Sequence, residues 1–436
     1  MKLNIDSKEP IMNRLRGDKV IWIVVFLLSL ISIALIYSSS SSKAFKDSVT
    51  NFSILMDQCK FVGMGIVFMY ICYRIPLGMY RRLTYFIFGI SLVMLMLTPI
   101  IGVEYNGAKR WLPLGPITIQ PAEFVKVTLI LYLAKVLEVF SFDTFKEFLI
   151  KVIVPIGVVC VIIMMSSVST TLFVGILSFA ILVIAGVKWS YLFKSALIGA
   201  ATLLVLVLLN LAIVKIFDKD FFPRFSTALS RVEEFFVKPE VSDEMTAEEK
   251  QKKADETFQA DMAKIAISSS NILGKGPGKS TQRYVLPHPY SDFIYAIIIE
   301  EYGLLGGVFV LMLYIWFFYR CVMLTRNCTR KFTGLTVGGI GLMITAQAGL
   351  HILVNVGIFP VTGHTLPLIS LGGTSFVIFS SAFGIILSVS RTIEDEAAKR
   401  EEQKAAATQL ANSQPSNEQL EAEFHTIIDE QTGEFK

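Results

Sequence analysis

Charged residues are scarce in this sequence. Asp, Glu, Lys and Arg make up 17% of the 436 residues, whereas hydrophobic residues make up 53%. A soluble domain usually has about 25% charged residues, so this shortage excludes an ordinary soluble domain. Several apolar runs reach the ~20 residues that a helix needs to cross a bilayer. The sequence therefore predicts an all-α polytopic membrane protein.

Cysteine and histidine are also few. The five cysteines are scattered without a C-x-x-C pair, and the four histidines are not spaced for a metal. We therefore interpret the cysteines as unpaired packing residues. No metal site built from the protein alone is expected.

The apolar runs define ten expected transmembrane helices. They cover residues 20–38, 61–75, 83–101, 122–140, 149–166, 171–187, 191–216, 292–319, 334–357 and 367–390. Every second short connection carries at least two Lys or Arg residues, and such basic loops face the cytoplasm. With an even number of spans, both termini are expected in the cytoplasm. Residues 1–19 then precede a membrane domain of residues 20–392.

Two segments lie outside the membrane in this topology. Residues 393–436 are rich in Glu, Gln, Ala and Ser and are expected to form a disordered or weakly helical cytoplasmic tail. Residues 217–291 form a large extracytoplasmic loop. Within it, a capping-box pattern at Thr246 and Glu249 precedes an expected amphipathic helix. The apolar positions of this helix are Phe258, Met262, Ile265 and Ala266.

The same loop contains "GKGPGKS" (274–280), which is similar to a phosphate-binding P-loop. The P-loop needs four residues between its glycines, but only three separate Gly274 and Gly278. No buried strand is expected before this stretch. The pattern therefore argues against a nucleotide site and favours either a flexible turn or a hinge near a substrate.

Three polar clusters enter expected spans from the outer side, where an ionisable residue is a functional-site hypothesis by default. The first is "GAKRWLPLGPITIQPAEFVK" (107–126). Glu123 and Lys126 share a helical face, so they either form a salt bridge or shape a cavity. Lys109 and Arg110 are either solvated loop residues or hold an anionic group at the outer surface.

The second cluster is "LPHPYSDFIYAIIIEEYG" (286–303), which carries three carboxylates. Glu300 and Glu301 point to different sides of a helix, so they do not form one catalytic pair. At least one is expected to bond polar groups of a neighbouring element. Asp292 lies at the outer mouth of the span, either as an N-cap or as a catalytic carboxylate.

The third cluster is "NVGIFPVTGHTLPLISLGGTS" (355–375), where Pro and Gly interrupt the helical pattern beside Thr362 and Ser370. Broken backbone at membrane depth is tolerated where it is buried in protein or lines a wet cavity. This stretch is therefore either a tight packing loop or a cavity lining. Together, the clusters favour a transporter or an enzyme that acts on an amphiphilic anion.

These clusters, in this order, resemble the SEDS family (shape, elongation, division and sporulation). "GAKRWLPLG…QPAEFVK" is similar to the family pattern G-A-x-R-W…Q-P-[SA]-E-x-x-K, and the other two clusters match family patterns of similar length. The resemblance covers roughly residues 15–392. Two positions depart from it: "MSSVST" (165–170) lacks the Pro, Asp and Gly of the family's Q/E-P-D-x-G-T, and Leu371 replaces a Tyr.

The resemblance implies an inverting peptidoglycan glycosyltransferase that polymerises lipid II. Asp292 would be the general base, and outer cations would hold the leaving pyrophosphate. The one cofactor considered is a divalent cation, Mg²⁺ or Mn²⁺, for which no protein cage is evident. The implied substrate-binding residues are Lys109, Arg110, Trp111, Gln120, Glu123, Lys126, Arg231, Thr362 and Ser370.

The implied partners are lipid II, a class B penicillin-binding protein transpeptidase and other membrane proteins of the division machinery, without nucleic acid. The implied location is the bacterial inner membrane at the division septum, because the motifs resemble division members more than elongation members. Three alternatives stay open. They are a lipid II flippase, a non-catalytic scaffold and an elongation polymerase.

The expected topology predicts which positions a membrane-impermeant thiol reagent reaches in intact cells. The 217–291 loop is expected outside, so a Ser242→Cys variant should be labelled. The tail is expected inside, so a Ser413→Cys variant should be protected until the cells are permeabilised. Labelling of the tail variant in intact cells, or protection of the loop variant, would contradict the topology.

Overall fold

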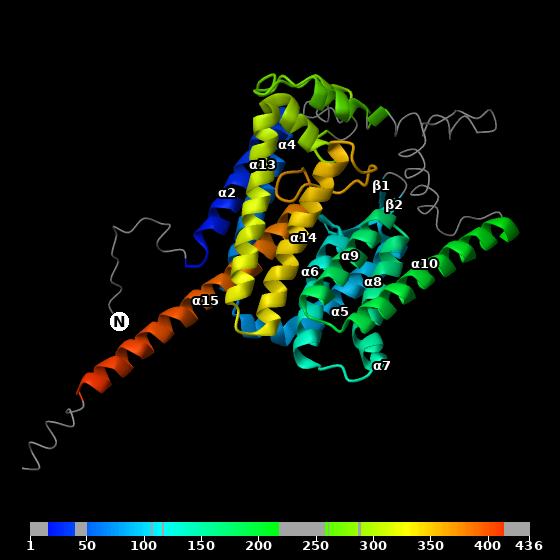
Figure 1. Cartoon of the computed structure of the whole chain (residues 1–436). Helices are drawn as coiled ribbons and strands as arrows, with labels where there is room; N and C mark the ends of the chain where they lie inside the picture. The colour runs from blue at the N-terminus through cyan, green and yellow to red at the C-terminus, as the bar shows by residue number, and fades with distance from the viewer. Residues whose placement is uncertain are drawn as a thin grey trace, which may run out of the picture.

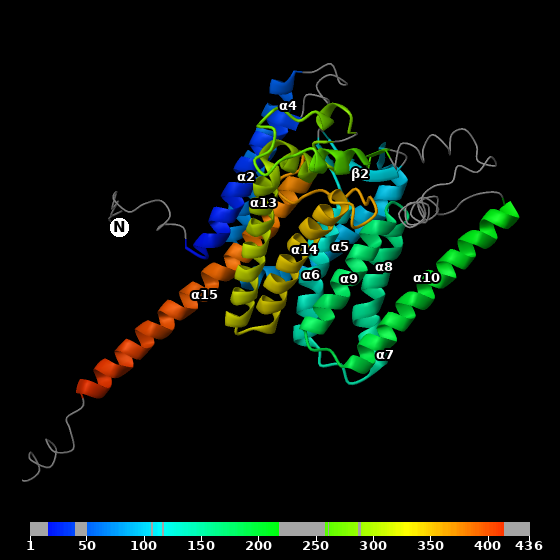
Figure 2. The ribbon, with the colours of Figure 1, turned by 45° about the horizontal axis from the view of Figure 1, so that its top comes forward.

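The computed structural model describes residues 16–39, 50–105, 108–115, 117–217, 258–259, 261–286 and 289–413. Long helices dominate this part of the chain (Figures 1 and 2). In chain order they are α2 (Lys19–Ser39), α4 (Asn51–Arg74), α5 (Leu77–Ile101), α6 (Pro121–Val139), α7 (Phe145–Phe148), α8 (Val154–Met164), α9 (Val168–Ile184), α10 (Trp189–Phe217), α13 (Ile294–Asn327), α14 (Lys331–Asn355) and α15 (Thr374–Ser413).

These helices match the ten expected spans. In the described ranges, eight helical segments are long and apolar enough to cross a membrane. Helix α9 is apolar but shorter, and α6 has 19 residues with charged groups among them. Helix α7, a π-helical turn (Leu149–Ile153) and α8 form one continuous span. The all-α polytopic fold is confirmed, although the second span begins at Asn51 rather than at residue 61.

A small antiparallel sheet was not expected from the sequence. Its strands β1 (Val103–Tyr105), β2 (Ala108–Leu114) and β3 (Ile117–Ile119) pair in that order, where a loop was predicted. Gly115 has a φ of 67° in the tight turn after β2, a conformation that glycine adopts at little cost. Because β2 contacts α5 and α6, the sheet places its cationic residues beside the start of α6.

The site end of the bundle is the end that carries the sheet, residues 261–286 and the 356–373 loop between α14 and α15 (top in Figure 1). At the opposite end, Arg320 Nε donates to Asp18 Oδ2 at 2.8 Å and ties α13 to the start of α2. Most turns at this opposite end carry the basic residues expected for a cytoplasmic face.

Small residues allow α4 and α15 to pack closely. A Cβ placed on Gly384 would lie 2.3 Å from the carbonyl oxygen of Met69, and one on Gly65 would lie 2.7 Å from Ser380 Oγ. Such close approach increases dispersion contacts, which drive helix association where lipid tails are as apolar as the side chains.

The structure describes parts of the two expected non-membrane segments. Helix α15 continues to Ser413 and extends past the bundle (Figure 1), so the boundary expected at residue 393 lies inside a helix. Residues 261–268 are helical as expected, with Ala263 and Ala266 buried and Phe258 and Ile265 exposed. The expected capping box and Arg231 lie outside the described residues.

Candidate active site

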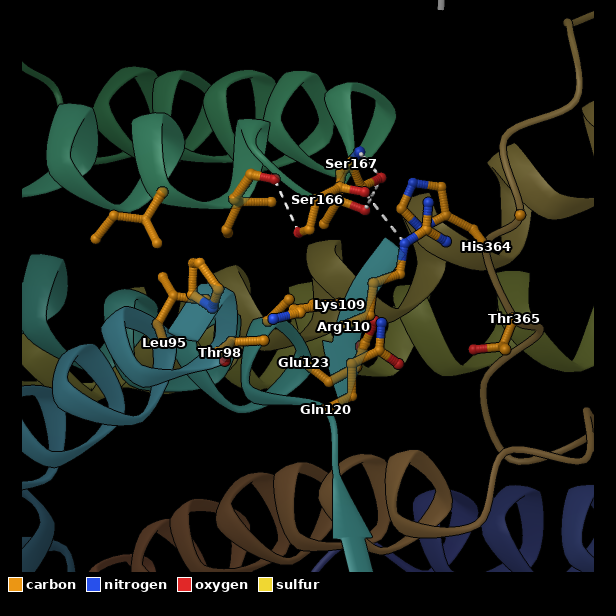
Figure 3. Close-up of a pocket in the computed structure, with 16 residues that line it drawn as sticks. Leu95, Thr98, Lys109, Arg110, Gln120, Glu123, Ser166, Ser167, His364 and Thr365 are labelled. Carbon is orange, nitrogen blue, oxygen red and sulfur yellow. Dashed lines mark hydrogen bonds between the residues drawn. The ribbon is translucent and has the colours of Figure 1, made fainter. Parts of the chain in front are cut away.

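A pocket at the site end is lined by residues from β2, the start of α6, the α8–α9 turn and the 356–373 loop (Figure 3). Four of the predicted substrate-binding residues lie in this lining. The polar residues of the lining are Thr98, Lys109, Arg110, Gln120, Glu123, Ser166, Ser167, Thr170, His364 and Thr365.

Two cations of β2 reach the pocket. Lys109 is exposed, and its Nζ donates to the carbonyl oxygen of Ile100 at 3.4 Å. Arg110 is half-buried, and its Nε donates to the carbonyl oxygen of Ser166 at 3.2 Å (Figure 3). The divergent 165–170 stretch thus contacts Arg110 through the backbone carbonyl oxygen of Ser166.

A buried ion pair adjoins these cations. Lys126 Nζ lies 2.7 Å from Glu123 Oε2, and the two side chains are 0% and 6% exposed. The same ammonium donates to Gln347 Oε1 at 2.6 Å, and Gln347 Nε2 donates to the carbonyl oxygen of Thr365 at 3.1 Å. The expected salt bridge is therefore confirmed. It neutralises both charges and, through Gln347, holds the 356–373 loop.

The charge of the pocket follows from these contacts. Burial, and next the positive charge of Lys126, lower the pKa of His364 to about 3, so this imidazole is neutral near pH 7. Glu123 and Lys126 cancel each other. The net positive charge comes from Lys109 and Arg110, so the pocket is suited to an anionic group.

Asp292 lies beside the pocket. A Cβ placed on Gly363, which lines the pocket, would lie 3.7 Å from Asp292 Oδ2. The N-cap position of α13 is Phe293, whose own side chain makes no capping hydrogen bond, so Asp292 does not occupy the N-cap position that the sequence allowed. A half-buried carboxylate and a cationic pocket are thus neighbours.

The backbone of Asp292 is held by Asn355 of α14. Asn355 is fully buried, and its Nδ2 donates to the Asp292 carbonyl oxygen at 3.1 Å. Its Oδ1 accepts from the Ala296 N–H at 3.1 Å, which would otherwise be an unpaired donor in the first turn of α13. One side chain from another helix therefore caps α13 and fixes the position of Asp292.

The remaining predicted residues lie elsewhere. Ser370 Oγ donates to the carbonyl oxygen of Ser291 at 2.8 Å and so connects two backbone segments. Trp111 is half-buried opposite Val103 in the sheet and is not in the pocket lining. Thr362 adjoins Gly363, and its Oγ1 is buried without a hydrogen-bond partner in the described structure.

Glu300 and Glu301 bond polar groups away from the pocket lining, as the sequence predicted. Glu300 accepts hydrogen bonds from residues 275–282, and Glu301 accepts one from Ser38 of α2. Asp292 is therefore the only one of the three carboxylates in the second cluster that adjoins the pocket.

Sequence reasoning did not assign the roles of Asn355, Gln347 and His364. Each is a polar residue in or beside an expected span, and that signal was available from the composition of the span. Their partners, however, are on other elements, so the pairing was visible only in the structure.

The fold and the pocket define a polytopic membrane protein with a cationic, carboxylate-flanked site at one end. A family model described as "Cell cycle protein", covering FtsW, RodA and SpoVE, matches residues 18–395. The chain belongs to this FtsW/RodA/SpoVE family.

Individual relatives agree with the family. A protein of Hydrogenovibrio crunogenus named "Probable peptidoglycan glycosyltransferase FtsW" is 30% identical over 84% of this chain and 90% of the relative. "Stage V sporulation protein E" of Bacillus subtilis is 27% identical over 86% and 97%.

Solved structures share the fold. A chain of a structure described as "Structural coordination of polymerization and crosslinking by a peptidoglycan synthase complex" has a TM-score of 0.64 at 24% identity, over 86% of this chain and 98% of that chain. Thermus thermophilus RodA has a TM-score of 0.61 at 23% identity, over 87% and 98%.

The buried ion pair predicts a strongly non-additive pair of substitutions. Lys126→Met leaves the Glu123 carboxylate buried without its cation and should destabilise the protein by about 3–5 kcal/mol. The double variant Glu123→Gln/Lys126→Met removes both charges and should recover much of this loss. Thermal unfolding in detergent measures both. Additive losses in the double variant would show that the two groups do not act as a pair.

Proposed function

We propose that this protein is an inverting peptidoglycan glycosyltransferase that polymerises lipid II, with Asp292 as the general base. The observation that carries the proposal is the position of the Asp292 carboxylate beside Gly363, at the edge of the pocket that holds Lys109 and Arg110. The names of the relatives in the same family support the substrate class.

The reaction needs a base at one atom. The 4-hydroxyl of the GlcNAc of one lipid II attacks C1 of the MurNAc of a growing chain. As the new C1–O bond forms, Asp292 takes the hydroxyl proton, and a positioned base of this kind contributes about 100-fold or more to the rate. The bond from C1 to the diphosphate breaks on the opposite face, so the configuration at C1 inverts.

The leaving group needs positive charge. Undecaprenyl diphosphate departs with the electron pair of the broken bond, and cations fixed in place before the reaction stabilise that charge. Lys109 and Arg110 provide them. Gln120 and the hydroxyls of the α8–α9 turn add hydrogen-bonding groups to the same lining. Glu123 and Lys126 shape the pocket as a neutral pair.

The described residues do not form a protein cage for Mg²⁺ or Mn²⁺. Divalent cations of this class take oxygen ligands, mostly carboxylates, and no group of three or more His, Cys, Asp or Glu side chains gathers in the described ranges. No step above is therefore assigned to a metal ion.

The family supports a proposal for the wider role of the protein. We place the site end outside the cytoplasmic membrane and both termini inside, as the basic turns of the opposite end favour. The FtsW names among the relatives favour septal synthesis in division. A class B penicillin-binding protein and other division proteins are the proposed partners, since one structure with this fold is a synthase complex of polymerisation and crosslinking.

Substitution of Asp292 distinguishes a polymerase from a flippase or a scaffold. Asn is nearly isosteric with Asp but is a very poor base. Asp292→Asn should leave thermal stability and lipid II binding close to wild type, and glycan polymerisation should fall by about 100-fold or more. Gel analysis of labelled lipid II products, with the partner transpeptidase present and conventional glycosyltransferases excluded, measures the effect.

Two outcomes of that assay count against the proposal. A product ladder of wild-type strength from the Asn variant would remove Asp292 as the base. No ladder from an intact wild-type complex, together with transfer of lipid II across vesicles, would favour the flippase.

Substitution of Arg110 tests the role of the pocket cations. Hydrogen bonds to charged groups are worth about 1.5–3 kcal/mol, so Arg110→Ala should lower lipid II use by roughly tenfold to hundredfold. Arg326→Ala is the control, because Arg326 is an exposed cation in the last turn of α13, at the opposite end. Initial polymerisation rates over a range of lipid II concentrations compare the two. Similar mild losses in both variants would show that Arg110 does not bind the diphosphate.

A further inference from the structure

Helix α13 is interrupted at Gly303, whose φ of 72° and ψ of −173° are not helical. The interruption is called the Gly303 break. The "GKGPGKS" segment supplies partners to the backbone groups that the break leaves without helical bonds. The Lys275 N–H donates to the Glu300 carbonyl oxygen at 2.9 Å, and the Gly276 N–H donates to that of Glu301 at 2.9 Å. This segment is thus hydrogen-bonded to the backbone of α13 and is not a free turn.

The contact at the break leaves no room for side chains. A Cβ on Gly274 would lie 2.3 Å from the Gly303 nitrogen, and a Cβ on Gly303 would lie 2.1 Å from the carbonyl oxygen of Ile272. Both glycines also have positive φ, which other L-residues rarely adopt. Glycine is therefore required on both sides of the contact.

The same segment, together with Thr281 directly after it, encloses the Glu300 carboxylate, which is 0% exposed. Lys275 Nζ donates to Glu300 Oε1 at 2.6 Å, and Ser280 Oγ donates to Oε2. The Thr281 N–H and Oγ1 donate to Oε1 at 3.0 Å and 2.8 Å. A buried carboxylate with this many donors strongly restrains the groups that surround it.

The α13 arm, residues 294–302, links this enclosure to the site. At its start, Asn355 binds the Asp292 carbonyl oxygen and the Ala296 N–H. At its other end, the Lys275–Glu300 ion pair and the backbone bonds at the Gly303 break fix its direction. The arm is thus held at both ends, and Asp292 lies two residues before its first residue.

We propose that Lys275 and Glu300 are positioning residues, whose ion pair locks the α13 arm at the Gly303 break and thereby sets where the Asp292 carboxylate stands relative to the pocket. The catalytic part of this proposal rests on the proposed function. A misplacement of about 1 Å can lower a rate by about 100-fold, so a small pivot at the break is enough to matter.

The chain contains a matched control for this ion pair. Arg320 and Asp18 form a second ion pair of α13, on the other side of the break, with side chains 34% and 2% exposed. Lys275 and Glu300 are 28% and 0% exposed. Lys275→Met and Arg320→Met therefore each leave a buried carboxylate without its cation, but only the first lies next to the arm.

The experiment compares kinetics, stability and hydrogen exchange in purified full-length variants with the partner transpeptidase. Both Met variants should unfold at a lower temperature than wild type. Lys275→Met should lower kcat for glycan polymerisation at least about tenfold with KM for lipid II little changed, and Lys275→Arg should restore most of kcat. Amides of residues 294–302 should exchange faster in Lys275→Met and at the wild-type rate in Arg320→Met.

The readouts separate this proposal from the proposed function. Equal kcat losses in the two Met variants, or a loss confined to KM, would overturn the positioning role. Unchanged exchange of the α13 arm in Lys275→Met would overturn the lock itself. A wild-type complex that makes no glycan contradicts the proposed function, and the exchange comparison then still tests the lock.

Discussion

The Gly303 break is the constraint on which the site end depends. A helix inside a bilayer can stop and restart only where protein groups or the water of a cavity pair with its backbone, because lipid offers no hydrogen-bond partners. Here a separate segment enters at the break and bonds the carbonyl oxygens of Glu300 and Glu301. Helix α13 is therefore divided into two parts with different surroundings. The long part packs in the bundle, and the short part carries Asp292 to the pocket.

Buried charges in the bundle are also paired, each carboxylate with one cation. Glu123 with Lys126, Glu300 with Lys275, and Asp18 with Arg320 each combine a carboxylate that is almost fully buried with one cation. A single buried charge would cost several kcal/mol, so these pairs allow charged residues inside or at the ends of apolar helices. Lys109 and Arg110 differ in position, since both line the pocket beside the Glu123–Lys126 pair. Their charge is what the pocket offers to an anion.

Much of the architecture followed from the sequence, because the length of an apolar run is a local property that hydropathy measures directly. The Glu123–Lys126 pair was also predictable, since residues three apart on a helix are neighbours. The sheet was not, because two of its three strands have only three residues, which is too short to show a period. The enclosure of Glu300 by Lys275 and Thr281 joins positions 25 and 19 residues apart. No local sequence pattern around Glu300 or around residues 275–281 predicts this contact.

The candidate site also contains residues that the sequence singled out and residues whose roles were visible only in the structure. Lys109, Arg110 and Asp292 were found from charge at the edges of expected spans, where each residue is conspicuous by itself. Asn355 and Gln347 were not, because an amide in a helix gains its role only from the elements that it faces. Ser370 is a different case. The family resemblance implied a substrate contact for it, and the structure adds a backbone role, because its hydroxyl donates to the carbonyl oxygen of Ser291.

The "GKGPGKS" segment (274–280) shows that a sequence similar to a phosphate-binding loop can bind an anion of its own chain. Its backbone and side-chain donors converge on an anion, as they do in loops that bind nucleotides, but the anion is a side chain of the same protein. The effective concentration of a ligand tethered in this way exceeds that of a free competitor such as inorganic phosphate. The Glu300 carboxylate therefore occupies this anion-binding segment as soon as the chain folds. The binding energy stabilises the fold and is not used to bind a free ligand.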